Sequence, residues 1–223
     1  MKLWIFGDSM CTAYKLNEEQ GWPFLLAKSL GIDYENYAQP GIDNFYIYQS
    51  FLAKSKNISG SDIVIIGWSH PSRKTFTLDR KNKSHIDILP YSLHYVCDGQ
   101  EFIRSDVGKI ESRLNNFEKW GKMSPYDSSI AFYDNWFNTY YSEYEQNCNF
   151  QSYIDSVKMR CPGRYIPFWF SKESVKNINH NTGAGYILDF VVEHSVAIDE
   201  QTDLHPNVNG HMLWTDHLKY LIE

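Results

Sequence analysis

The chain has 223 residues, a formal net charge of -6 and 22% charged residues. This length supports one sizeable core, and the proportion of charged residues argues against general disorder. The mildly acidic balance argues against nucleic acid as the main partner, because phosphate binding needs clustered Lys and Arg. The short basic segment at residues 80–83 is interpreted as a solvated loop.

No segment approaches the roughly 20 apolar residues that a membrane span needs. The apolar run at the N-terminus is short and leads into Gly-Asp-Ser, which is not a small-residue cleavage site. We therefore interpret this run as a first strand and not as a signal peptide. The localisation expected from these features is cytoplasmic or unknown, with no membrane span.

The sequence shows no pattern of metal or nucleotide binding. Its four cysteines include no Cys-x-x-Cys pair and are interpreted as reduced thiols, although pairing of Cys148 with Cys161 stays open. The histidines are scattered without a His-Glu-x-x-His motif, and His211 and His217 are expected to face solvent. Glycine-rich phosphate loops are also missing. We expect neither a metal nor an organic cofactor.

The first 70 residues alternate between short apolar runs and helical patterns. Strands are predicted at 3–6, 33–38 and 63–66, and the last of these is β-branched throughout. Helices are predicted at 21–30 and 44–54, the second with Asn44 as its N-cap. This order predicts an α/β fold in which helices cover both faces of a parallel sheet.

The rest of the chain is less regular. Residues 72–127 are polar with little periodicity, and we interpret them as an insertion or lid over the sheet edge, not as a second domain. Residues 128–159 look helical, with a break near 147–149. Further strands are predicted at 164–170 and 194–198. A terminal helix is predicted at 205–223 with Pro206 in its first turn.

Ser9 directly follows the first predicted strand. Ligands of parallel α/β sheets bind beyond the carboxyl ends of the strands. A serine at this position can expose its hydroxyl and leave its backbone N–H free, which supplies half of an oxyanion hole. Alternatively Ser9 caps a helix. The neighbouring Asp8 is expected to hold backbone N–H groups and not to act as a base.

Near the other end of the chain, Asp203 precedes His205 by two residues. A histidine acts as a base through one ring nitrogen when an acceptor orients the other, and a turn could bring Asp203 into that role. Alternatively Asp203 caps the terminal helix and His205 is incidental.

Together the Gly-Asp-Ser at 7–9 and the Asp-x-His-Pro at 203–206 resemble the marks of the SGNH (GDSL-type) hydrolase family. The resemblance implies one SGNH-hydrolase-like domain over residues 1–223, with a flavodoxin-like three-layer α/β/α fold. It also implies that Ser9 is the nucleophile, His205 the general base and Asp203 the orienting acid.

Two further family blocks supply oxyanion-hole donors, and this chain matches them unequally. Gly41 matches the glycine that follows the second strand. After the third strand the family's Gly-x-Asn-Asp is replaced by Gly-Trp-Ser-His at 67–70, which puts Ser69 at the asparagine position. A hydroxyl donates one hydrogen bond, and losing an oxyanion donor costs about 10²- to 10³-fold in rate. Asn44 or His70 could serve instead, and Arg73 could bind an anionic group of the substrate.

The resemblance implies a serine esterase without cofactors that hydrolyses an ester of a small molecule or of a carbohydrate. The 16% aromatic residues lean faintly toward an O-acetylated sugar. A non-catalytic carbohydrate-binding or structural module is the first alternative, favoured by the replaced asparagine. An acyltransferase is the second. The acyl group, the alcohol and the oligomeric state stay open.

Overall fold

The computed structural model describes residues 1–79, 84–89, 92–97, 100–104, 142–180, 183–199 and 203–223, with side chains of residues 76–141 outside this description. The chain divides into two compact units. The first combines residues 1–71 with 149–223, and the second covers residues 72–148.

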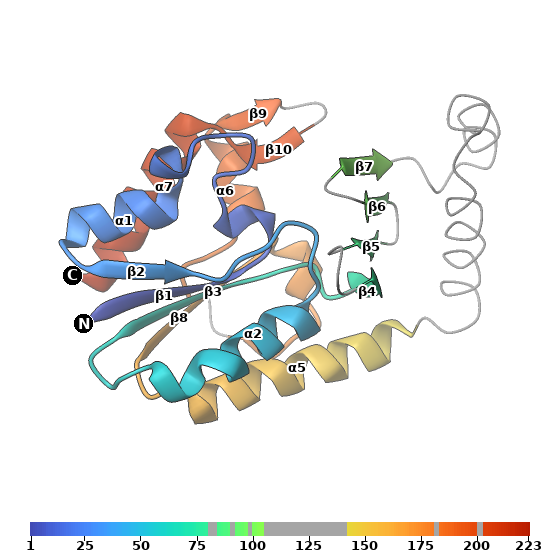
Figure 1. The fold of residues 1–223 in the computed structure, drawn as a ribbon, viewed down its shortest axis with the longest axis horizontal. Coiled ribbons are helices and arrows are strands. Elements are labelled where there is room, and N and C mark those ends of the chain that lie inside the picture. Colours follow the sequence, from blue (N-terminus) through green and yellow to red (C-terminus); the bar gives the residue numbers. More distant parts are fainter. Residues whose placement is uncertain (80–83, 90–91, 98–99, 105–141, 181–182, 200–202) are drawn as a thin grey trace. The chain divides into compact units, whose positions relative to one another are not determined.

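The first unit is built on a four-stranded parallel sheet (Figure 1). Its strands are β1 (Lys2–Gly7), β2 (Asp33–Asn36), β3 (Ile63–Trp68) and β8 (Arg164–Trp169), in the order β2-β1-β3-β8. All three neighbouring pairs run parallel. The central strands β1 and β3 are apolar because helices cover both of their faces. The parallel sheet predicted from the sequence is confirmed.

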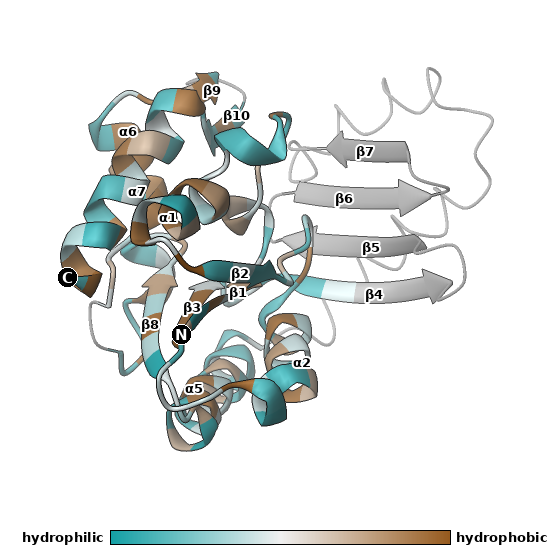
Figure 2. Ribbon diagram, turned by 60° about the vertical axis from the view of Figure 1, so that its left-hand side comes forward, coloured by the Kyte–Doolittle hydropathy of each residue, from teal (hydrophilic) through white to brown (hydrophobic). Residues whose placement is uncertain are grey.

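Helices lie on both faces of this sheet. One face carries α1 (Trp22–Leu30), α6 (Ile187–Glu193) and α7 (Val208–Ile222), and the other carries α2 (Asn44–Lys54) and α5 (Glu143–Arg160). The alternation of side chains along β1 sorts them between the two layers. Leu3 and Ile5 pack with α1, α6 and α7, whereas Trp4 and Phe6 pack with α2 and α5. Figure 2 shows apolar β3 enclosed between the helices. The three-layer α/β/α architecture is therefore confirmed.

Several predicted details were wrong. Asp43, and not Asn44, caps α2, because the Asp43 carboxylate accepts from the Tyr46 N–H. Helix α5 continues unbroken through 147–149, and the predicted helical residues 128–141 lie outside the described residues. The predicted strand at 194–198 is β9 (Ala197–Asp199), which pairs antiparallel with β10 (Asp203–Pro206) outside the parallel sheet. Pro206 thus ends a strand, and Asn207 caps α7.

The second unit contains an antiparallel meander that the sequence analysis missed. Its strands are β4 (Lys74–Asp79), β5 (Ser84–Leu89), β6 (Ser92–Cys97) and β7 (Gln100–Arg104), paired in chain order. They mix polar and apolar residues, and their stability depends on cross-strand pairs that local periodicity does not reveal. The interpretation of this segment as a lid stays a prediction.

The structure also bears on the cysteines and on the expectation that the chain has no membrane span. Cys11, Cys148 and Cys161 are free thiols, so Cys148 and Cys161 do not pair. Within the described ranges, every helix is too short or too polar to cross a bilayer.

Candidate active site

Ser9 lies in a tight turn at the carboxyl end of β1. The turn passes through Gly7, where a Cβ atom would overlap the Cys11 side chain and approach the Gly67 carbonyl oxygen to 2.8 Å. Only glycine fits there. Ser9 then begins a 3₁₀ helix, Ser9–Cys11, whose cap is Asp8: its carboxylate accepts from the Met10 N–H at 3.0 Å. The predicted structural role of Asp8 is confirmed, and the alternative in which Ser9 caps a helix is wrong.

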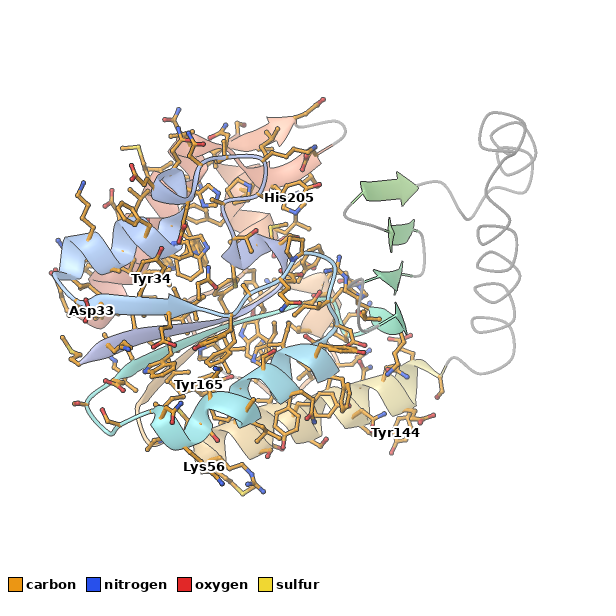
Figure 3. The ribbon with its side chains drawn as sticks, viewed as in Figure 1. Asp33, Tyr34, Lys56, Tyr144, Tyr165 and His205 are labelled. Carbon is orange, nitrogen blue, oxygen red and sulfur yellow. The ribbon has the colours of Figure 1, made fainter. Side chains whose placement is uncertain are left out.

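The structure brings Ser9, His205 and Asp203 together, although they come from opposite ends of the chain. The Ser9 Oγ and the His205 Nε2 lie 2.7 Å apart, and the His205 Nδ1 lies 2.6 Å from the Asp203 Oδ1. The same Oδ1 accepts from the His205 backbone N–H at 3.2 Å. Figure 3 labels His205 on the side of the sheet toward which the parallel strands point. Asp203 and His205 both belong to β10, so a short strand fixes their local geometry.

This chain of contacts selects one tautomer of His205. A carboxylate has only acceptors, so the proton of a neutral His205 must lie on Nδ1, facing Asp203. The Nε2 lone pair then faces the Ser9 hydroxyl and can accept its proton. Burial raises the pKa of Asp203, but hydrogen bonds from Lys15 and His205 outweigh it and hold this pKa below its usual value. Asp203 is therefore an anion at neutral pH.

The predicted oxyanion residues follow the ends of the neighbouring strands. Gly41, with a φ of 75°, lies in the loop after β2, and that loop is tied to the Ser9 turn because the Gln39 N–H donates to the Gly7 carbonyl at 3.0 Å. Ser69 directly follows β3. Its side chain is fully buried, and its hydroxyl has no hydrogen-bond partner among the described residues. A buried hydroxyl without a partner is uncommon in folded proteins and calls for an explanation.

Asn44 is held by the backbone of the loop that carries Ser69. Its Nδ2 donates to the carbonyl oxygens of Ser69 at 3.0 Å and His70 at 3.4 Å, and its Oδ1 accepts from the Ser69 N–H at 2.8 Å. The Asn44 amide is therefore engaged through both its nitrogen and its oxygen. Asn44 positions the loop in this structure, and a direct role in substrate binding stays a prediction.

The other two predicted substrate-binding residues lie in different surroundings. The His70 ring packs edge-on against Phe170, with ring centroids 6.0 Å apart. Arg73 belongs to the second unit. Their contacts with a substrate stay predictions. Among the residues that the structure describes, no three His, Cys, Asp or Glu side chains gather as a metal site.

Sequence reasoning missed two residues that contact the Asp203–His205 pair. Tyr14 stacks on the His205 ring, with centroids 4.1 Å apart and planes inclined by 29°. The Lys15 Nζ donates to the Asp203 Oδ2 at 2.7 Å. The partners are separated by nearly the whole chain, and the polar segment around Tyr14 and Lys15 carries no motif. No sequence signal could have indicated these contacts.

His211 was expected to face solvent, and this was wrong. It is buried on α7, and its Nδ1 accepts from the Trp22 backbone N–H at 3.2 Å. His217 is half-buried and contacts the Ala184 carbonyl oxygen through its Nε2 at 2.7 Å. Burial, and secondarily the nearby His205, lowers the pKa of His211 to about 4. Protonation of the His211 Nδ1 would place its N–H opposite the Trp22 N–H, so the hydrogen bond between them would be lost.

This low pKa predicts acid sensitivity. Unfolded His211 titrates at its ordinary pKa near 6.5, so its contribution to stability is complete above pH 6.5 and is lost as the pH falls toward 4. The full loss is roughly 3 kcal/mol. His211→Asn keeps an acceptor for the Trp22 N–H but does not titrate. We expect its free energy of unfolding, measured with urea, to fall less between pH 7 and 4.5 than that of the wild type.

His194→Asn, at the exposed end of α6, is the matched control and should follow the wild-type curve. Equal pH dependence of the wild type and His211→Asn would contradict the prediction.

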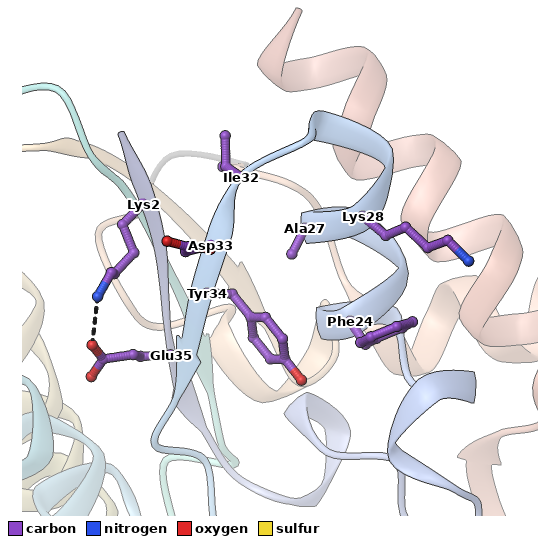
Figure 4. A pocket seen from close by; sticks show the side chains of 8 residues that line it. All are labelled: Lys2, Phe24, Ala27, Lys28, Ile32, Asp33, Tyr34 and Glu35. Atoms are coloured by element: carbon purple, nitrogen blue, oxygen red, sulfur yellow. Dashed lines mark hydrogen bonds and ion pairs between the residues drawn. The ribbon is translucent and has the colours of Figure 1, made fainter.

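The surface also has an open pocket of about 670 Å³ between α1 and the edge strand β2 (Figure 4). It is lined by Phe24, Tyr34 and a Lys2–Glu35 ion pair at 2.7 Å, among others. Its residues come from the start of β1, from α1 and from β2, while Ser9 follows the end of β1. The pocket contains none of the predicted site residues.

Comparison with solved structures finds the same fold in known proteins. The psychrotrophic esterase EstA from Pseudoalteromonas sp. superposes with a TM-score of 0.50 at 13% sequence identity, over 100% of this chain and 99% of that one. TesA superposes with a TM-score of 0.55 at 13% identity, over 100% of this chain and 98% of that one. No protein-family model and no curated protein matches the sequence. The chain therefore shares its fold with these two proteins, and the predicted three-layer α/β/α fold is confirmed.

Proposed function

We propose that this protein is a serine esterase in which Ser9 is the nucleophile, His205 the general base and Asp203 the residue that orients His205. The observation that carries the proposal is the continuous contact from the Ser9 Oγ to His205 and from His205 to Asp203, at 2.7 and 2.6 Å. These distances lie within the range required for a nucleophile, its base and the base's orienting group.

The reaction begins when the Ser9 Oγ attacks the ester carbonyl carbon while its proton passes to the His205 Nε2. The C=O π pair moves onto the carbonyl oxygen. Collapse of this tetrahedral intermediate breaks the C–O bond, and the departing alcohol takes the proton from Nε2. A water molecule then attacks the acyl-Ser9, giving its proton to Nε2, and the carboxylic acid leaves as Ser9 recovers its proton.

The negative charge on the intermediate requires hydrogen-bond donors. Ser9 is the first residue of a 3₁₀ helix, so its backbone N–H has no hydrogen-bond acceptor within that helix. Gly41 supplies a backbone N–H from the loop tied to Gly7, and the Ser69 hydroxyl is the third donor in the proposal. The unpartnered state of this buried hydroxyl supports its assignment, because burying a donor without a partner costs about 1–3 kcal/mol.

The same contacts favour an esterase over a purely binding module. A binding site does not need an imidazole whose tautomer is fixed by a carboxylate and whose free nitrogen faces a serine hydroxyl. The substrate class in the proposal is a carboxylic ester of a small alcohol or a sugar. Transfer of the acyl group to an alcohol differs from hydrolysis only in the second attacking group.

Two measurements on the wild-type protein test the proposal. The first is hydrolysis of p-nitrophenyl acetate near pH 8, where an ordinary imidazole is neutral. The second is peptide mass spectrometry after treatment with a p-nitrophenyl alkylphosphonate. This reagent is chosen because a solved structure of EstA, which has a similar fold, contains the enzyme inhibited by monoethylphosphonate. We expect turnover, and one phosphonate adduct on Ser9 formed with loss of p-nitrophenolate.

A folded protein that neither turns over the ester nor forms the adduct would contradict the proposal and favour a binding role. Added glycerol separates hydrolysis from transfer, because a transferase would form glycerol acetate faster than acetate.

A further inference from the structure

The Asp203 carboxylate contacts a cation that the reaction described above does not use. The Lys15 Nζ lies 2.7 Å from Asp203 Oδ2, while Oδ1 accepts from His205. We propose that Lys15 is a positioning residue that holds Asp203 in place for His205 and sets the lower pH limit of activity. This inference rests on the proposed function of Ser9, His205 and Asp203.

The contacts of Asp203 leave its carboxylate little freedom. Oδ1 accepts from both the Nδ1 and the backbone N–H of His205, and Oδ2 accepts from Lys15. Rotation of the carboxylate would weaken at least one of these charge-assisted bonds. The Asp203 side chain is only 12% exposed, so water competes weakly for its oxygens.

The backbone of Lys15 supports a role beyond a chance surface contact. Its φ is 58°, in the left-handed region that favours glycine, and among the described non-glycine residues only Ser195 shares a positive φ. This conformation is unfavourable for a residue with a Cβ atom, because the Cβ crowds the following carbonyl oxygen. A lysine kept at a strained position is consistent with a requirement for its side chain.

The loop that carries Lys15 is fixed to the Ser9 turn. The Thr12 N–H and Oγ1 both donate to the Ser9 carbonyl, at 3.1 and 2.8 Å, and the Leu16 N–H donates to the Ala13 carbonyl at 2.9 Å. Tyr14 lies in the same loop and stacks on His205, and the Lys15 Nζ lies 5.2 Å from the centre of the Tyr14 ring. One loop therefore contacts the nucleophile, the base and the orienting acid.

The charges around His205 determine the direction of the effect on pH. Its ionisable neighbours are Asp203 on its own strand, Tyr14 on the loop and His211 on α7. His211 is neutral above pH 5, because burial holds its pKa near 4. Lys15 neutralises part of the Asp203 charge and so disfavours the imidazolium form of His205. Removing Lys15 should therefore keep His205 protonated, and Ser9 inactive, to a higher pH.

The test compares wild type with Lys15→Met, which keeps most of the side-chain length, and Lys15→Arg, which restores the charge. Lys28→Met is the matched control, because Lys28 is a cation at the far end of α1 that contacts Phe24. The two readouts are the pH profile of kcat/KM with p-nitrophenyl acetate and the NMR titration of the His205 imidazole.

We expect Lys15→Met to move the acidic limb of the profile and the imidazole titration upward by about 0.5 pH unit, a shift that 0.5 M salt reduces. Its plateau kcat/KM should fall about tenfold, at the lower end of the range for removing a residue that orients an active-site group. Lys15→Arg should return both readouts toward wild type, and Lys28→Met should leave both unchanged.

If the Lys15–Asp203 ion pair serves only as a weak surface contact, the pH profile and the imidazole titration of Lys15→Met will match those of the wild type. That result would overturn the inference. If wild type shows no turnover, the proposed function fails, while the imidazole titration of Lys15→Met against wild type still decides whether Lys15 acts on His205.

Discussion

Replacing Ser9 with alanine should lower kcat/KM for p-nitrophenyl acetate by about 10⁴- to 10⁶-fold, to the rate that oxyanion contacts and binding alone support. The variant lacks the atom that forms the acyl intermediate in the proposed reaction, and His205 then faces a methyl group. Ser9 is 8% exposed, and its Oγ has the His205 Nε2 as its hydrogen-bond partner at 2.7 Å. We expect the fold to tolerate the loss of one hydroxyl that makes one contact.

Ser29→Ala is the matched control. Its hydroxyl also makes one contact, to the Leu26 carbonyl at 2.9 Å, but it lies near the C-terminal end of α1, away from the Ser9 turn. This variant should keep wild-type activity. Ser9→Ala should also remain unlabelled by the phosphonate. Retention of more than a tenth of the wild-type kcat/KM by Ser9→Ala would place the nucleophile elsewhere.

Asp203→Asn should lower kcat/KM by about 10⁴-fold while the geometry stays similar. An asparagine that presents its NH₂ group to His205 would place a donor opposite Nδ1. Nδ1 would then have to accept, and the proton of a neutral His205 would move to Nε2, where it blocks proton transfer from Ser9. The same substitution removes the Lys15–Asp203 ion pair.

Asp155→Asn is the control for removing a carboxylate, because Asp155 is an exposed residue of α5 that contacts Gln151 and Lys158. It should keep wild-type activity. Circular dichroism and urea unfolding would establish that Asp203→Asn is folded at the assay pH. An Asp203→Asn variant that is folded and within tenfold of wild type would mean that His205 does not depend on a carboxylate for its tautomer.

Sequence patterns predict those parts of the fold that depend on neighbouring residues. The apolar run at 63–66 and the spacing of Trp22, Leu25 and Leu26 were enough to place β3 and α1. The choice between Asp43 and Asn44 as the N-cap of α2 could not be made from neighbouring residues. Both residue types are good caps, and the side chain of Asn44 is instead engaged by the loop at Ser69, 25 positions away.

The buried position of His211 could have been predicted. Residues 211, 214 and 218 follow the i, i+3, i+7 spacing of one helix face, and Trp214 and Leu218 are both buried. The polarity of histidine led to the wrong interpretation. By contrast, the contact between Lys15 and Asp203 joins two polar segments without a pattern, and only the folded chain reveals it.

The candidate site joins the two ends of the sequence, and this has a consequence for synthesis on the ribosome. The N-terminal end of a chain leaves the ribosome first and can begin to fold during synthesis. Ser9 and the first three parallel strands therefore leave the ribosome long before β10. The Ser9 hydroxyl gains its His205 partner only after β10 has emerged, and α7, which follows it, packs with α1 and β1 in one core. Under the proposed function, a nascent chain lacking its last segment would carry a nucleophile without a base. Esterase activity would then appear only after β10 has left the ribosome.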